Sequence, residues 1–296
     1  MHITSIFDEH KTSFSFEFFP PKTEKGYNKL FRTIRDLKPL QPSSISVTYG
    51  AGGSTRKLTH DLVLKIHQET DLTVIPHLTC INAKKDEIYS LVKDYADNGI
   101  ENIFVIRGDA PQGQEDGDHA VKDFRYAVDL VRFIKKHFPR MGMGVAGFPE
   151  GHPDTPNRLK EMEYLKEKID AGADYMITQM CFDNRDFFDF RERCELMGID
   201  VPIIAGIMPI TSRKNMYRMS DLAAGSRFPA KLQRAIHRVD EDERVENVGV
   251  HWATSQVLEL LDNEVNGIHF YTLNKSMATR RIYEALGTTN SRQLAI

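Results

Sequence analysis

The sequence predicts an α/β protein folded as one (β/α)8 barrel of the TIM type. Eight short segments rich in β-branched and aromatic residues alternate with segments whose apolar residues recur every three or four positions. The first four of these strands begin about thirty residues apart, which is the length of one strand–helix unit. No G-x-G-x-x-G turn follows any of them, so the fingerprint of an open dinucleotide-binding sheet is missing.

The predicted strands alternate with helices, which favours parallel pairing through right-handed βαβ units. The strands are Ser13–Phe19, Ser44–Tyr49, Thr73–Thr79, Asn102–Arg107, Met143–Phe148, Tyr175–Met180, Pro202–Met208 and Gly267–Leu273. Helical periodicity is clear over Lys57–Gln68, Val121–His137 and Leu159–Asp170. The long stretch from Thr211 to Val265 predicts extra helices between strands seven and eight, with a loop over Ser220–Ala230. No linker interrupts the chain, so we expect one domain over residues 1–296.

Composition and charge disfavour several classes of partner and location. The chain is 41% hydrophobic and 27% charged, with a net charge of -3, so no basic field favours nucleic acid or an anionic membrane. Its three cysteines show no paired spacing, which argues against disulfides and suits a reducing cytoplasm. The chain has neither a signal-peptide pattern nor an apolar run of membrane-spanning length. We therefore expect a cytoplasmic protein with small-molecule partners.

Residues 15–22, Ser-Phe-Glu-Phe-Phe-Pro-Pro-Lys, set a carboxylate inside an aromatic strand that two prolines end. Alternating aromatic residues suit a half-buried strand, and two prolines cannot continue a ladder. Glu17 is thus expected near the carboxyl end of a buried strand, where loss of hydration would raise its pKa toward the range of a general acid. A structural ion pair with a buried Arg or Lys explains this run equally well.

Polar residues also end most of the other predicted strands, which favours a functional role for Glu17. They are Thr48, His77, Thr79, the run Arg107-Gly108-Asp109, His152, Gln179, Tyr271, Asn274 and Lys275. The carboxyl ends of the strands converge on one face of a parallel barrel, so we expect these residues to form one pocket. In the run 107–109, the glycine permits close approach of a ligand between a cation and a carboxylate, which suits an anionic or heteroaromatic ligand.

The possible metal ligands do not form a recognised motif. Glu17, His77, Asp109 and His152 are suitable residue types, but no H-x-H or H-E-x-x-H spacing groups them. No G-x-S-x-G elbow supports a serine hydrolase. His77 in an apolar strand is also explained as a hydrogen-bonded core histidine. We therefore expect no metal.

Eight runs in the chain resemble those of the bacterial 5,10-methylenetetrahydrofolate reductases, in the same order. They are 15–22, 46–51, 76–80, 107–109, 152–153, 170–173, 177–179 and 270–274, which together span nearly the whole chain. The resemblance is to the catalytic domain alone. It implies a homo-oligomeric barrel with non-covalent FAD. The flavin would pass hydride from NADH or NADPH, with NADH favoured, to methylenetetrahydrofolate by ping-pong kinetics. The product, 5-methyltetrahydrofolate, would feed methionine synthesis.

The resemblance also implies roles for individual residues. Glu17 would be the general acid that opens the folate ring, and Asp109 the carboxylate beside flavin and pterin. Substrate contacts are implied at Glu17, Asp109, Gln179, Met219, Tyr271 and Lys275. FAD contacts are implied at Thr48, His77, Ile106, Arg107, Gly108, Asp109, Tyr126, Ala127, Ala146, Phe148, His152, Glu161, Tyr164 and Lys168.

Some of these positions depart from the usual residues of the family. Phe148 stands in place of a tyrosine and lacks its hydroxyl, and Glu161, Tyr164 and Glu167 also differ. Lys275 replaces an arginine and keeps the charge without the bidentate fork that suits a carboxylate. We expect these changes to tune the affinity for ligands without abolishing activity.

Two other functions are compatible with the pattern. An FAD barrel oxidoreductase of the proline dehydrogenase type would share the fold and cofactor but would not need an acid at Glu17. A non-catalytic folate- or flavin-binding partner would not need the combination of Glu17, Asp109 and Gln179. The presence of all three residues favours the reductase.

Overall fold

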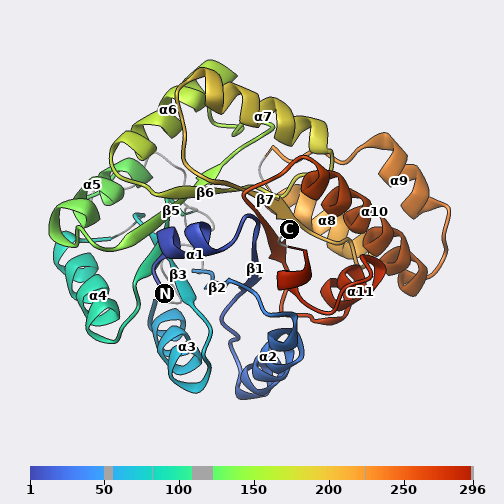
Figure 1. Ribbon diagram of the computed structural model, residues 1–296, viewed down its shortest axis with the longest axis horizontal. Helices are drawn as coiled ribbons and strands as arrows, with labels where there is room; N and C mark the ends of the chain where they lie inside the picture. The colour runs from blue at the N-terminus through green and yellow to red at the C-terminus, as the bar shows by residue number, and fades with distance from the viewer. Residues whose placement is uncertain (50–55, 82, 109–122, 224, 295–296) are drawn as a thin grey trace.

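The protein forms a closed barrel of eight parallel strands in sequence order, as the sequence predicts (Figure 1). The computed structural model describes residues 1–49, 56–81, 83–108, 123–223 and 225–294. The barrel closes because β8 pairs with β1. The strands are β1 Ser13–Phe18, β2 Ser44–Val47, β3 Val74–Thr79, β4 Asn102–Ile106, β5 Gly142–Gly147, β6 Tyr175–Thr178, β7 Ile203–Ile207 and β8 Gly267–Tyr271.

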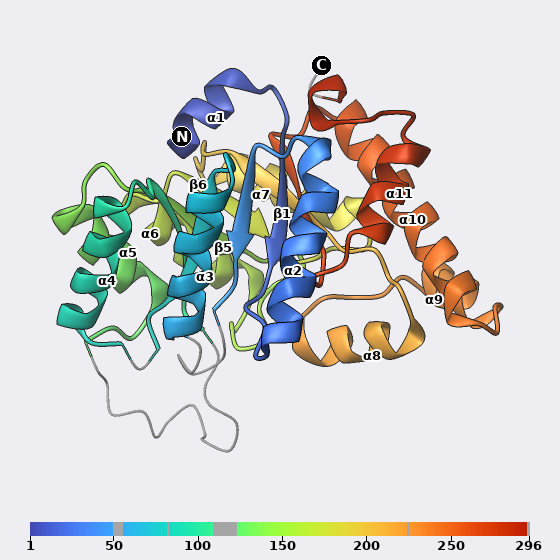
Figure 2. The same cartoon turned by 90° about the horizontal axis from the view of Figure 1, so that it is seen from below.

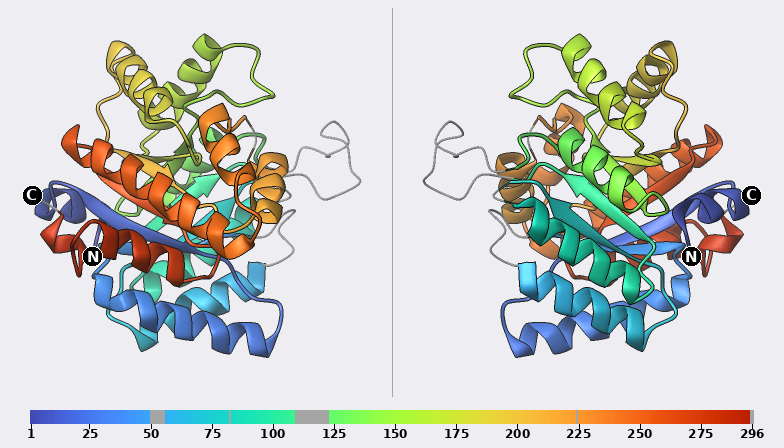
Figure 3. Two further views of the ribbon diagram at one scale, coloured as in Figure 1. Left: turned by 90° about the vertical axis from the view of Figure 1, so that its right-hand side faces the viewer. Right: turned by 90° about the vertical axis from the view of Figure 1, so that its left-hand side faces the viewer.

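Helices surround the barrel. They are α1 Ile3–Glu9, α2 Glu24–Leu37, α3 Arg56–Glu69, α4 Lys85–Asp97, α5 Ala127–His137, α6 Arg158–Asp170, α7 Asn184–Leu196, α8 Arg213–Leu222, α9 Ala230–His237, α10 Asp242–Asp262 and α11 Met277–Ala285, with short 3-10 helices at Lys38–Leu40 and Ser291–Gln293. Figure 3 shows α9, α10 and α11 on one side of the barrel and α4 and α5 on the opposite side. The predicted extra helices between strands seven and eight are confirmed as α8, α9 and α10. No helix among the described residues is long and apolar enough to cross a membrane.

Several predicted boundaries were wrong by a few residues, for identifiable reasons. The sixth strand ends at Thr178 instead of Met180, because the hydroxyl of Tyr271 donates a hydrogen bond to the Thr178 carbonyl at 2.8 Å. Helix α5 begins at Ala127, since the Asp129 carboxylate accepts the backbone N–H of Tyr126 and so fixes the helix start. Residues 121 and 122, where the predicted helix begins, lie outside the described residues. The predicted loop after residue 220 begins later, because α8 continues to residue 222.

Strand β1 illustrates how the barrel separates its two faces. Phe14, Phe16 and Phe18 belong to the main hydrophobic core of the protein and are at most 1% exposed. Ser15 and Glu17 alternate with them and therefore point to the opposite side of the strand, toward the barrel interior. The apolar side chains of β1 therefore pack outside the barrel, and its polar side chains face the barrel interior.

Helix α1 covers the amino-terminal end of the barrel. Its Ile3 and Ile6 pack with inward-facing residues such as Phe104 and Tyr175, and the Ile3 backbone N–H donates to the Asn102 side chain at 2.7 Å. Figure 2 shows α1 at one end of the barrel and α8 at the other. The carboxyl ends of the strands, where the sequence places the polar residues, therefore lie at the end away from α1.

A second, smaller core lies under the extra helices and adjoins the strand ends. It contains Met180, Phe182, Met208, Ile210, Met216, Met219, Ala223, Leu232, Ile236 and Val245. The Phe228 ring stacks on Phe182 with ring centroids 4.4 Å apart, and the Trp252 indole donates to the Phe182 carbonyl at 2.9 Å. The segments after β6 and β7 are thus held by a core distinct from that of the barrel.

We expect Gly249→Ala to lower the free energy of unfolding by about 1–3 kcal/mol, the usual range for overpacking. Gly249 lies in α10, where alanine is normally favoured over glycine by about 1 kcal/mol. Here an added Cβ would overlap the backbone carbonyl of Ile210, after β7. Urea unfolding measures the change, with Ser255→Ala on the exposed face of α10 as the control. A more stable Gly249→Ala variant would contradict this packing argument.

Candidate active site

Glu17 lies one residue before the end of β1, which confirms its predicted place near the end of a buried strand. Its neighbours across the sheet are Ser46 in β2 and Tyr271 in β8. The side chain is 19% exposed, and the Thr272 hydroxyl donates to the Glu17 backbone carbonyl. The backbone is thus fixed while the carboxylate faces the barrel interior.

Two buried histidines flank the Glu17 carboxylate. Its Oε2 lies 3.6 Å from Nε2 of His77 and 3.7 Å from Nε2 of His269. Neither nitrogen has a hydrogen-bond partner within the described part of the chain. Nδ1 of His269 lies 2.7 Å from the Ser15 hydroxyl, so its Nε2 is directed toward Glu17. The carboxylate thus lies between two buried imidazole rings, of which His269 is oriented by Ser15.

His269 is a site residue that no sequence pattern predicted. It is a single histidine in an apolar strand and matches no motif. The available signal was its spacing, because residues 269 and 271 lie two apart and so share the inward face of β8. His77 was expected among FAD contacts, and the structure places its side chain beside Glu17.

The charge state of His77 follows from its burial. Desolvation lowers its pKa to about 4, although the nearby Glu17 carboxylate acts in the opposite direction. The ring is therefore neutral at pH 7 and offers Glu17 a hydrogen-bonding group that carries no charge.

The end of β4 is fixed by backbone contacts. The Ile81 N–H donates to the Arg107 carbonyl at 3.0 Å, and Gly108 follows with a φ of +82°. A Cβ at position 108 would lie 2.9 Å from the Thr79 side chain, so only glycine fits without displacement. Ile106, Arg107 and Gly108 are partly exposed here, while Asp109 lies outside the described residues.

The segment from the end of β5 through α6 brings together five of the residues predicted to bind FAD. The Lys168 ammonium donates to the Ala146 carbonyl at 2.8 Å, and burial lowers its pKa to about 8 against the opposing effect of Glu161. Glu161 is 6% exposed and accepts the His152 backbone N–H at 3.3 Å. The Phe148 and His152 rings meet edge to face, with centroids 4.9 Å apart. Helix α6 thus supplies a cation and a carboxylate, and the loop before it supplies an aromatic pair.

The ends of β6, which neighbours β5, and of β8 carry further predicted site residues. The Gln179 side-chain carbonyl accepts the Met180 backbone N–H at 2.9 Å, while Tyr271 reaches the neighbouring Thr178 carbonyl. Burial and the Glu17 charge raise the pKa of Tyr271 well above its ordinary value, so its hydroxyl stays protonated. Met219 from α8 is buried in the small core that contacts Tyr271.

Other predicted contacts are less closely integrated. Thr48 follows β2 directly, and its carbonyl accepts the Thr59 hydroxyl at 3.1 Å. Tyr126, just before Ala127, and Tyr164 in α6 are about half exposed, and Lys275 is exposed beyond β8. In the described ranges, no side-chain hydrogen bond joins these last residues to the groups around Glu17. Their proximity to a ligand remains a prediction.

No cluster of three or more His, Cys, Asp or Glu side chains suited to a metal ion occurs in the described residues. The acid–base groups near these strand ends are a carboxylate beside two buried imidazoles, a protonated phenol and a buried ammonium. This set can position and donate protons and can hold an anionic ligand.

A family model of methylenetetrahydrofolate reductase matches residues 2–287. The chain belongs to this family. It is 38% identical to the 5,10-methylenetetrahydrofolate reductase of Escherichia coli over 92% of this chain and 90% of that protein. It is 36% identical to Methylenetetrahydrofolate reductase (NADH) 1 of Arabidopsis thaliana, over 99% of this chain but 51% of that protein. The chain thus spans about half the length of its plant reductase relatives.

The fold has a match among solved structures. An uncharacterized protein from Clostridium thermocellum, described as binding two copies of 5-methyl-5,6,7,8-tetrahydrofolic acid, superimposes with a TM-score of 0.70. Each chain is covered to 95%, at 16% sequence identity. This likeness concerns the fold. Membership of the reductase family favours the reductase over the proline dehydrogenase type.

We expect His77→Asn to reduce the loss of folding stability that the protein shows as the pH falls. The folded pKa of about 4 lies below the ordinary 6.5, so the unfolded chain binds the proton first as the pH falls. Stability from neutral His77 is therefore complete above pH 6.5 and is lost as the pH falls through 4. This shift corresponds to at most about 3 kcal/mol.

Urea unfolding between pH 7.5 and 4 measures this effect as a difference between variant and native protein. His251→Asn, on the exposed surface of α10, is the matched control. Parallel loss of stability in the native protein and in His77→Asn would contradict a neutral, buried His77.

Proposed function

We propose that this chain reduces 5,10-methylenetetrahydrofolate to 5-methyltetrahydrofolate, using a nicotinamide donor and bound FAD. The observation that carries the proposal is the Glu17 carboxylate between His77 and His269, at the strand ends of a barrel in the reductase family. The name of the Escherichia coli relative supports the same substrate. The folate bound by the Clostridium thermocellum protein is consistent with a folate site on this fold.

The described residues fit a flavin nucleotide in chemical type. Lys168 supplies a buried cation for a phosphate-bearing ligand, and Gly108 leaves room where a side chain would collide with Thr79. The Thr79 hydroxyl is a buried polar atom without a hydrogen-bond partner in the described ranges, so it is available to a ligand. Arg107, Gly108, His152 and Lys168 would hold the cofactor. Bound FAD would supply hydride transfer between the nicotinamide and the folate.

The protein's own part is to supply and position a proton. Glu17 would donate from its carboxyl group to the folate amine nitrogen whose bond to the bridging carbon opens the five-membered ring. His77 and His269 lie on either side of the carboxyl group, and a neutral His77 does not hold it in a permanent ion pair. Asp109 would then stabilise the positive charge that develops on the opened folate.

Residues near the ends of β6 and β8 would orient the folate. The Gln179 amide is fixed through its carbonyl oxygen, which leaves its NH2 group as a donor. The protonated Tyr271 fixes the strand end beside it. Met219 would contact the apolar body of the substrate, and Lys275 its glutamate carboxylates.

Three finer statements belong to the same proposal. NADH is the expected donor, which the name of the Arabidopsis thaliana relative supports. The expected location is the cytoplasm, as the cysteine pattern indicates. The expected assembly is a homo-oligomer, by resemblance to the family.

Purified protein should show the visible absorption bands of a flavin. Anaerobic NADH should bleach these bands, and methylenetetrahydrofolate should restore them. Bands that stay bleached would support a flavoprotein reduced by NADH but would contradict methylenetetrahydrofolate as its substrate. A colourless protein that also fails to bind added FAD would reject the whole proposal.

Glu17→Gln should slow reoxidation by methylenetetrahydrofolate by about 10²–10⁴-fold, the usual range for a general acid. Flavin reduction by NADH should stay within about twofold, because that half-reaction does not use the same proton donor. Stopped-flow absorbance separates the two steps. Glu284→Gln, exposed on α11, controls for loss of a carboxylate elsewhere. Equal slowing of both half-reactions would remove Glu17 as the acid.

A further inference from the structure

The loop between β5 and α6, residues 148–157, carries two residues expected to contact FAD, Phe148 and His152. It begins with a tight turn, because the Gly151 backbone N–H donates to the Phe148 carbonyl at 3.0 Å. Pro149 occupies a central position of this turn, so its own carbonyl takes no part in closing it. Pro149 is buried, and a buried carbonyl needs a donor from elsewhere in the protein.

Arg193 of α7 supplies this donor. Its Nη2 donates to the Pro149 carbonyl at 2.8 Å, and its Nε donates to the Asp189 carboxylate, one turn earlier in the helix, at 3.0 Å. The same guanidinium lies over the Phe190 ring, 5.5 Å from the ring centroid. The Arg193 side chain is only 19% exposed, so these contacts are largely shielded from water and together fix its orientation.

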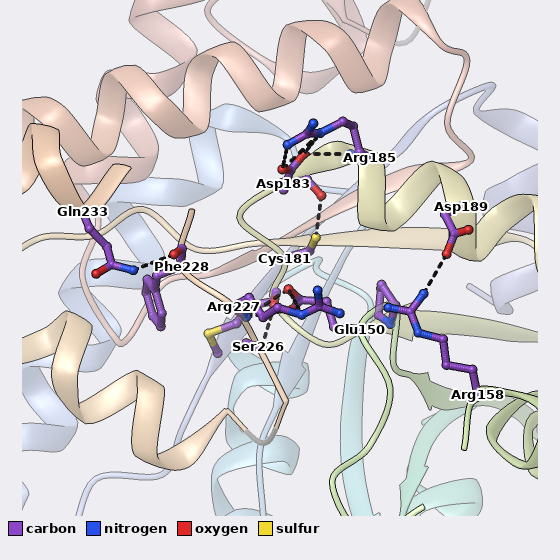
Figure 4. Close-up of polar contacts among 12 residues, drawn as sticks. Glu150, Arg158, Cys181, Asp183, Arg185, Asp189, Ser226, Arg227, Phe228 and Gln233 are labelled. Atoms are coloured by element: carbon purple, nitrogen blue, oxygen red, sulfur yellow. Dashed lines mark hydrogen bonds and ion pairs between the residues drawn. The ribbon is translucent and has the colours of Figure 1, made fainter. Parts of the chain in front are cut away.

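Asp189 connects Arg193 to the other end of the loop. Arg158, the first residue of α6, donates to the same carboxylate oxygen of Asp189 at 3.2 Å (Figure 4). The Arg158 and Asp189 side chains are about half exposed, so this ion pair alone contributes little stability. Its contribution is geometric, because α7 thereby contacts both the start and the end of the loop.

Phe190 packs directly against the end of β5. A Cβ at Gly147, the last residue of the strand, would lie 2.9 Å from the Phe190 ring. Arg193 therefore lies on a ring that is itself packed against the strand from which the loop leaves. The turn has a second contact, since the Arg227 backbone N–H donates to both carboxyl oxygens of Glu150 at 3.0 Å. Loss of the Arg193 contact should therefore loosen the loop without releasing it entirely.

We propose that Arg193 is a positioning residue for the flavin site. By holding the Pro149 carbonyl, it fixes the turn that sets the Phe148 and His152 rings edge to face, so the loop has its binding conformation before the cofactor arrives. Without Arg193, a smaller fraction of molecules would have this conformation, and the apparent dissociation constant for FAD would rise in inverse proportion to that fraction. The link to FAD rests on the proposed function, whereas the contact with Pro149 does not.

Arg193→Met tests the proposal, because methionine keeps an unbranched side chain over Phe190 but has no N–H donor. Asp189 keeps its pair with Arg158, so no buried charge loses its partner. Titration of the whole protein, freed of cofactor, with FAD measures the dissociation constant through flavin fluorescence. We expect a rise of about tenfold, the equivalent of one hydrogen bond from a charged donor. Arg193→Lys keeps a donor without the planar fork and should give a smaller rise.

Arg191→Met is the matched control. Arg191 also belongs to α7, lies over the Phe188 ring and donates to a backbone carbonyl, that of Asn263, at 2.9 Å. Asn263 follows α10 and precedes β8, away from the carboxyl ends of the strands. We expect Arg191→Met to leave the FAD dissociation constant within about twofold of the native value. Urea unfolding of both variants separates this effect from a general loss of stability.

Hydrogen exchange of the protein without FAD tests the contact independently. The peptide that covers residues 148–157 should exchange faster in Arg193→Met than in native protein, whereas peptides from β1 should not change. Added FAD should restore most of the protection. With saturating FAD, kcat for methylenetetrahydrofolate should stay within about twofold of native, because Arg193 acts through the loop and not on the reacting atoms.

An unchanged FAD dissociation constant in both Arg193 variants, or an equal rise in Arg191→Met, would overturn the proposal. A fall in kcat that saturating FAD does not reverse would also reject the positioning role. FAD binding without folate turnover would contradict the proposed substrate and leave the result for Arg193 intact. If native protein binds no FAD, the proposed function and the link to the cofactor both fail, and the exchange comparison still decides whether Arg193 holds the loop.

Discussion

Closure of the barrel between β8 and β1 is the constraint on which the rest of the structure depends. In a closed parallel sheet every strand has a fixed register, and alternate residues must face the interior. The register that pairs Glu17 with Ser46 and Tyr271 therefore also decides that His77 and His269 face the same space. The site follows from strand geometry and needs no long loop to bring its acid and its histidines together.

This constraint explains how β1 separates its apolar and polar side chains. Phe14, Phe16 and Phe18 take up the outer face of β1 and pack in the main core. The inner positions of β1 can therefore hold Ser15 and Glu17, while inner positions of other strands, such as Phe104 and Ile177, form an apolar cluster with α1. Helix α1 seals the amino-terminal end, which leaves the other end as the open side of the barrel.

The period-two pattern and the turn signals were sufficient to predict the eight strands and the placement of Glu17. They could not predict where each ladder stops, because a distant side chain such as Tyr271 takes the carbonyl that would continue β6. The position of His269 beside Glu17 depends on the register between β8 and β1, two strands far apart in the sequence. Ser15 and His269, which are in contact, are separated by 254 residues. A single histidine carries no local signal of that partnership.

The predicted site residues that lie within strands behave differently from those that lie outside them. Glu17, Ala146 and Tyr271 belong to strands, and their surroundings follow from the barrel. Tyr126 and Lys275 lie outside the strands and are exposed, so no packing constraint fixes them in the described chain. Family motifs thus identify which residue types to expect in the site. The register of the barrel strands determines which of those residues face the same part of the barrel interior.

The strand ends of the candidate site adjoin two cores. The barrel strands pack in the main core, whereas α8, α9 and the segment after β6 pack around Phe182 and Met219 in the smaller core. Helix α10 joins the two cores, because its Val245 packs in the smaller core while its Val250 packs in the main core. A directional contact adds to this packing, since the Arg227 backbone N–H donates to both carboxyl oxygens of Glu150. The parts of the candidate site are thus held together by a shared helix and by backbone hydrogen bonds as well as by the register of the barrel.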